Sequence, residues 1–77
     1  MKNLQKEIEE NFTFEVTRCR NELGLTQEQA AEAINISTRW LQSIESGRIP
    51  SAHTTLRIIS VLEIDGKNLK VRVSTLV

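Results

Sequence analysis

The chain has 77 residues, 39% of them hydrophobic and 26% charged, which is the composition of one small globular domain rather than of a disordered chain. Ten Lys and Arg side chains balance ten Asp and Glu, and this net charge of zero argues against a strong non-specific nucleic-acid binder. Because the sequence has neither an apolar run of membrane-spanning length nor a signal-peptide pattern, we expect a protein of the cytoplasm.

The residue types that support catalysis or metal binding are scarce. The single cysteine, Cys19, cannot form an internal disulfide; it is interpreted as a small buried side chain, with a redox or modification site as the alternative. One histidine and one cysteine are too few for the usual ligand set of a structural zinc site. No Cys–His pair or paired carboxylates indicate an active site, so we expect neither an enzyme nor a bound cofactor.

A long helix is predicted near the start of the chain. Residues 2–23 carry apolar side chains at spacings of three and four, which is typical of an amphipathic helix, and Gly24 can end it. Two or three acidic residues of this segment are interpreted as part of its solvated face. Asn11 and Thr13 form a weak point, so residues 1–11 either lengthen the helix or form a separate arm.

The middle of the chain predicts two short helices joined by a tight turn. Thr26 is a suitable N-cap for the first, and Gln29 completes a capping box with it. This helix must end near Asn35, because asparagine tolerates the left-handed conformation better than most residues. Ser37 can cap the second helix in the same way.

This pair of helices has the plan of a helix-turn-helix. Ala31 is the small residue that lets the two helices approach each other, and Gly47 is placed to end the second helix. The second helix, residues 37–46, has an outer face of side chains that can meet base edges and phosphates in a DNA major groove. These side chains are Thr38, Arg39, Trp40, Gln42 and Ser43.

The rest of the chain predicts a further helix, a last short turn and a strand. Pro50 and Ser51 open the helix, and Asp65 can cap the short turn, in which Leu69 is the inward residue. Residues 70–77 then alternate in the manner of a β-strand. Because the chain offers no second strand, we expect two copies to pair it across a two-fold axis in a homodimer, with a frayed tail as the alternative.

Three consecutive stretches carry a family resemblance: LGLTQEQAAEAI, NISTRWLQSIESG and RIPSAHTTLRIISVLEI. At these spacings the chain resembles the Cro/cI-type (XRE) family of phage and bacterial repressors from about residue 12 to residue 69. The resemblance implies an all-α, five-helix, lambda-repressor-like DNA-binding domain over residues 12–69. Residues 1–11 would then form an N-terminal helical extension, and residues 70–77 remain as the short C-terminal β-strand that the alternating pattern predicts, a candidate for dimerisation.

The resemblance also implies roles for single residues. Arg20 and Glu45 match a buried ion pair of the family. Arg39 is the best suited to read a base, because its planar fork can donate twice to guanine O6 and N7. The full set of base contacts implied is Thr38, Arg39, Gln42 and Ser43. The DNA backbone would be contacted by Gln27, Trp40, Arg48 and His53.

Two of these residues keep alternatives. His53 is either a phosphate contact or an ordinary exposed residue. Trp40 stands where the family usually has a small polar residue. It can pack against thymine methyls or sugar, cover a gap left by Ala30 where the family usually has Leu, or anchor a partner protein.

Three functions follow from these observations. The leading hypothesis is a sequence-specific transcriptional regulator of double-stranded DNA, a homodimeric repressor that reads the major groove with helix 37–46. The alternative is an antitoxin that binds a toxin protein and represses its own operon, because some antitoxins combine this fold with a C-terminal strand. The third is an interaction module that does not bind DNA.

Overall fold

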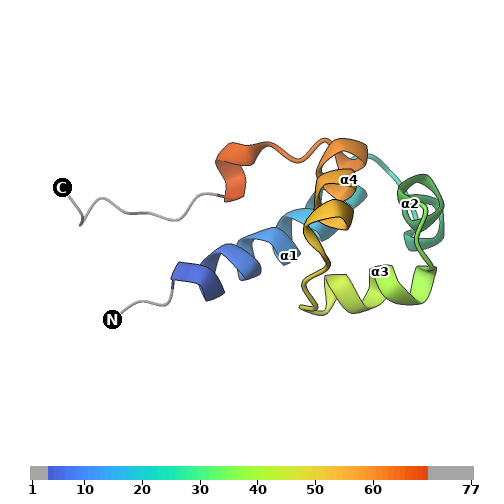
Figure 1. Ribbon diagram of the computed structural model, residues 1–77. Coiled ribbons are helices and arrows are strands. Elements are labelled where there is room, and N and C mark those ends of the chain that lie inside the picture. Colours follow the sequence, from blue (N-terminus) through green and yellow to red (C-terminus); the bar gives the residue numbers. More distant parts are fainter. Residues whose placement is uncertain (1–3, 70–77) are drawn as a thin grey trace.

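Four α-helices and one 3-10 turn make up residues 4–69, the part of the chain that this computed structural model describes (Figure 1). The elements are α1 (Leu4–Glu22), α2 (Gln27–Ile34), α3 (Thr38–Glu45), α4 (Ala52–Leu62) and the 3-10 turn η1 (Gly66–Leu69). The long helix α1 contacts α3, α4 and η1, while α2 contacts α3 and α4. The predicted all-α class is therefore confirmed.

The predicted number of five helices is wrong. Residues 66–69 form a single 3-10 turn, in which the Asn68 N–H donates to the Asp65 carbonyl at 2.9 Å. The Asp65 carboxylate does cap this turn, because it accepts from the Lys67 N–H at 2.9 Å, but four residues are too few to build an α-helix here. Residues 4–69 contain no strand, and the predicted C-terminal strand falls on residues 70–77, which lie outside the described residues.

The predicted helix starts are confirmed atom by atom. The Thr26 hydroxyl accepts from the Gln29 N–H at 3.0 Å, and the Gln29 side chain accepts from the Thr26 N–H at 2.9 Å. Ser37 accepts from the Trp40 N–H at 3.0 Å, and Ser51 caps α4 in the same way. Each cap satisfies backbone donors that the first turn of a helix leaves without a partner.

Helix α1 is continuous across the predicted weak point, so residues 4–11 lengthen it. Its predicted apolar face is buried only from Phe12 onward. Leu4 and Ile8 lie on the same face but are 40% and 45% exposed. The first two turns of α1 thus extend past the part of the helix that the core covers.

The core lies where α1, α2, α3 and α4 meet. Its fully buried large side chains come from all four helices and are Val16, Ile34, Leu41, Ile44, Ile58 and Leu62. Ala30 and Ala31 are also fully buried, on the side of α2 that faces the other helices. A small core of this kind stabilises the domain by removing apolar surface from water, and it fixes where α3 can lie.

One carboxylate of α1 is buried, which the sequence pattern did not indicate. Glu15 is 4% exposed and accepts from Arg18 Nε at 2.8 Å and from Arg18 Nη2 at 2.7 Å. The amide of Asn68 donates to the same carboxylate at 3.0 Å, which ties η1 to α1. The Arg18 hydrogen bonds, above all, hold the pKa of Glu15 below its ordinary value; burial opposes this lowering and Asn68 adds to it.

Glu15 is expected to make the protein sensitive to acid. Its pKa is lower in the folded chain than in the unfolded chain, so its stabilising effect is full near neutral pH and is lost as the pH falls through the folded-state pKa. Glu15→Gln should therefore lower the urea midpoint at pH 7, and the difference from wild type should shrink toward about pH 3. The same change at the exposed Glu32 is the control. Equal differences at both pH values would contradict the prediction.

Candidate nucleic-acid interface

The turn between α2 and α3 fixes the two helices relative to each other. Asn35 ends α2 in the left-handed conformation, with φ 67°, as predicted, and the Ile36 N–H donates to the Ala31 carbonyl at 3.0 Å. Ala31 is 1% exposed, and its small side chain lets the backbones come close at the crossing. The two helices therefore form a helix-turn-helix, with α3 on its outer side (Figure 1).

A residue of α4 also holds this turn. The Arg57 guanidinium donates through Nη2 to the carbonyl of Ile34, and to the carbonyl of Asn35 at 3.2 Å. These carbonyls belong to the end of α2, where the helix leaves acceptors without intrahelical partners. The role of Arg57 was not predicted, because nothing in a linear sequence indicates which arginine will reach a helix end more than twenty residues away.

An ion pair anchors the other end of α3. Arg20 Nε lies 2.7 Å from Glu45 Oε2, and Arg20 Nη2 lies 3.0 Å from Glu45 Oε1. The side chains are only 12% and 8% exposed. Arg20 Nη1 also donates to the Leu25 carbonyl at 2.9 Å, so this arginine joins α1, the loop before α2 and the end of α3. The structure thus places Arg20 and Glu45 together, as the resemblance implied.

Two glutamines extend this network to the surface. Gln27 Nε2 donates to Glu45 Oε1 at 3.2 Å, and Gln42 Nε2 donates to Gln27 Oε1 at 3.3 Å. Gln42 is exposed and Gln27 is half-buried at the start of α2. The network engages one Nε2 hydrogen of Gln42, while its other Nε2 hydrogen and its Oε1 can bond to a ligand.

The outward face of α3 is polar and carries no unpaired acid. Arg39 is exposed, while Thr38 and Ser43 are half-buried beside it. The Ser43 hydroxyl donates to the Arg39 carbonyl at 3.2 Å, which leaves its oxygen lone pairs to accept from a ligand. Glu45, the only acid of α3, is neutralised by Arg20.

Exposed arginines stand at both ends of this face. Arg39 near the start of α3 and Arg48 just after its end are exposed, and neither forms an ion pair within residues 4–69. His53, in the first turn of α4, is exposed as well. An anion that approaches α3 would therefore meet two exposed cations, although the net charge of the chain is zero.

Trp40 lies on the flank of α3 and not at the centre of its outward face. It is half-buried and packs against the hydrophobic core cluster. Of the interpretations of this residue, this position agrees best with a side chain that covers the core and leaves one edge at the rim of the polar face. An indole in such a place has a buried body and an accessible edge.

The described residues show no other candidate for a chemical site. No group of three or more His, Cys, Asp or Glu side chains in residues 4–69 is arranged to hold a metal ion. Within the same residues, no helix combines the length and apolar character that crossing a membrane requires. Cys19 is 7% exposed, and burial raises the pKa of its thiol, which favours the unreactive protonated form.

The fold and this polar helix face define a helix-turn-helix DNA-binding protein. The chain belongs to a helix-turn-helix domain family, whose model matches residues 12–70. No curated protein and no solved structure matches the chain. The match begins at Phe12, the residue at which the buried face of α1 begins.

Proposed function

We propose that this protein is a sequence-specific transcriptional regulator of the Cro/cI type, a homodimeric repressor that places α3 in the major groove of double-stranded DNA. The observation that carries the proposal is the outward face of α3. It is polar and bears arginines at both ends that form no ion pair within residues 4–69. It is held in place on both sides, by Arg57 at the turn before it and by the Arg20–Glu45 pair at its end. A rigid polar face of this kind suits base readout in a groove that admits one α-helix.

In this proposal the side chains divide by role. Thr38, Arg39, Gln42 and Ser43 contact base edges, while Gln27, Trp40, Arg48 and His53 contact the backbone and set the register. A dimer would place two such faces on half-sites about 34 Å apart. Binding to a promoter-overlapping site would block transcription. The antitoxin alternative depended on the pattern of residues 70–77, which lie outside the described residues, and it is not carried into the proposal.

Selection of binding sites from a random duplex pool tests this function directly. We expect a palindrome to be enriched, with half-sites one helical turn apart. Titration of the selected duplex at several salt concentrations should give a slope of about 0.9 per phosphate contact, and so a modest slope for a face with few cations. Failure to enrich any sequence, even at low salt, would overturn the proposal. A reporter with the selected site at its promoter then separates repression from activation.

A further inference from the structure

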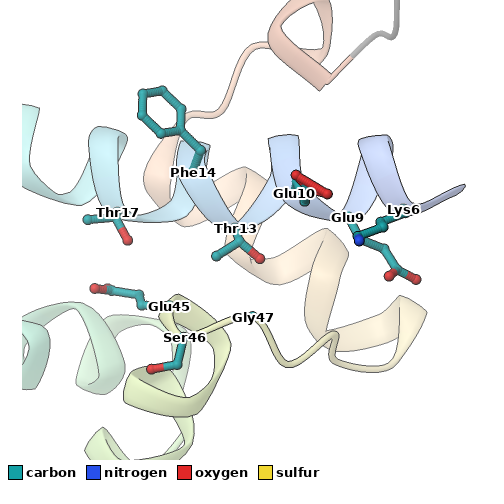
Figure 2. Close-up of a pocket in the computed structure, with 9 residues that line it drawn as sticks. All are labelled: Lys6, Glu9, Glu10, Thr13, Phe14, Thr17, Glu45, Ser46 and Gly47. Atoms are coloured by element: carbon teal, nitrogen blue, oxygen red, sulfur yellow. The ribbon is translucent and has the colours of Figure 1, made fainter. Parts of the chain in front are cut away.

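The solvent face of α1 carries an aromatic side chain that the domain itself does not cover. Phe14 is 64% exposed, although α1 buries Phe12 and Val16 on either side of it in the sequence. Because two helical positions differ by about 200°, the ring projects almost directly away from the core. Surface hollows of about 610 Å³ and 400 Å³ adjoin the ring, and both include Phe14 and Thr17 in their walls. Figure 2 shows the ring pointing away from the end of α3.

Charged residues flank Phe14 in a self-complementary order. At intervals of four residues α1 carries Lys6, Glu10, Phe14, Arg18 and Glu22. Residues at this spacing form one row along a helix surface. If a second α1 lies antiparallel with Phe14 at the centre, Glu10 faces the partner subunit's Arg18 and Lys6 faces the partner subunit's Glu22. Each row then meets opposite charges at all four charged positions.

We propose that this face of α1 is a self-association surface, on which a second copy of the chain packs its own α1 antiparallel, with the two Phe14 rings at the two-fold axis. The contact is isologous, as expected of a closed homodimer. The aromatic centre and charged rim have the arrangement of a protein–protein interface.

Arg18 has one donor left for this additional contact. Within its own chain its Nε and Nη2 donate to Glu15, its Nη1 donates to Glu22, and its Nη2 also donates to Cys19 Sγ at 3.5 Å. A guanidinium has five N–H donors, so one hydrogen of Nη1 remains for a carboxylate of the partner. The bonds to Glu15 also hold the guanidinium in place, which lowers the entropy cost of the contact.

The position of α3 relative to this surface agrees with binding of a dimer to one duplex. Thr13 and Thr17 face the Glu45–Gly47 end of α3, whereas Phe14 points away from it (Figure 2). Thr13 precedes Phe14 by one residue and so projects about 100° around α1 from it. The two-fold axis of an antiparallel helix pair is perpendicular to the plane of the two helices. Both copies of α3 therefore lie on the same side of that plane.

This inference deepens the proposed function, because it names the surface through which the proposed dimer forms. Only the DNA-binding part of its test rests on that function, because self-association is measured without DNA. Leu56 of α4 gives a matched control: it is 67% exposed, but the residues four positions to either side are Ala52 and Ser60, which carry no charge.

Sedimentation of the full chain in the absence of DNA is the test. We expect a reversible dimer whose dissociation constant rises at least about tenfold in Phe14→Ser, while Leu56→Ser changes little. Glu10→Lys should weaken the dimer as well, because each of its two contacts with Arg18 becomes repulsive, and added salt should reduce this penalty. Glu32→Lys, on the exposed side of α2, is the matched charge control. Circular dichroism confirms that each variant is folded.

The outcomes separate the surface from the function. A chain that stays monomeric up to about 1 mM, or a dimer that Phe14→Ser leaves intact, overturns the inference. Wild type and Phe14→Ser should bind an isolated half-site with equal affinity, while Phe14→Ser should bind the full palindrome more weakly than wild type does. A dimer that needs Phe14 but selects no DNA sequence supports the surface and refutes the proposed function.

Discussion

Glu45→Ala is expected to destabilise the protein by about 3–5 kcal/mol, because it leaves the guanidinium of Arg20 buried without its counter-ion. Arg20 is 12% exposed and makes two hydrogen bonds to Glu45, so water cannot readily replace the carboxylate. Small domains are stable by only about 5–15 kcal/mol in total, and the loss should be visible as a large fall of the urea midpoint at neutral pH.

Two controls separate a stranded charge from a general loss of contacts. Glu22→Ala removes the exposed partner of Arg18 and should cost less than about 1 kcal/mol. The double variant Arg20→Met with Glu45→Leu replaces the pair by apolar side chains of similar length, and it should recover most of the stability lost in Glu45→Ala. If Glu45→Ala unfolds at the same urea concentration as wild type, the Arg20–Glu45 pair is not desolvated in solution.

Arg39→Ala is expected to relax the sequence preference of DNA binding at one position in each half-site, without loss of stability. Arg39 is exposed and its guanidinium bonds to no other group within residues 4–69, so the fold does not depend on it. A bidentate contact to guanine gives about 1–3 kcal/mol of discrimination, which corresponds to roughly tenfold to a hundredfold in relative affinity. Titration of the selected duplex and of its single-base variants measures this loss.

Arg48→Ala is the matched control for Arg39→Ala. Arg48 is also an exposed arginine but lies past the end of α3, where a phosphate contact is proposed. Its loss should weaken binding to all sequences about equally and reduce the salt slope by about 0.9. If the two variants behave alike, Arg39 does not read a base.

Features specified by neighbouring residues were predictable from the sequence. The capping box of Thr26 and Gln29, the left-handed turn at Asn35 and the cap at Ser37 depend on side chains that reach only a few residues along the chain. A linear pattern contains this information directly. The polar face of α3 follows from the same local periodicity once the helix is placed.

Features that join distant parts of the chain were not predictable from residue patterns. Glu15 looks like its solvated neighbours until η1 brings Asn68 over it, 53 residues later.

The end of α4 was missed as well: Glu63 takes the left-handed conformation, with φ 56°, where glycine is the usual choice. The fifth helix was expected from the resemblance, but residues 66–69 form one 3-10 turn.

The hydrogen bonds from Arg57 also determine how much ordering DNA binding requires. Since α4 holds the turn between α2 and α3, that turn is not an independent hinge, and its hydrogen-bonded Ile36 amide should exchange slowly with solvent. Helix α3 and the turn before it then have their final conformation before the protein binds DNA. Most of the heat-capacity change of association would therefore come from the contact surface itself, with little contribution from folding of the protein.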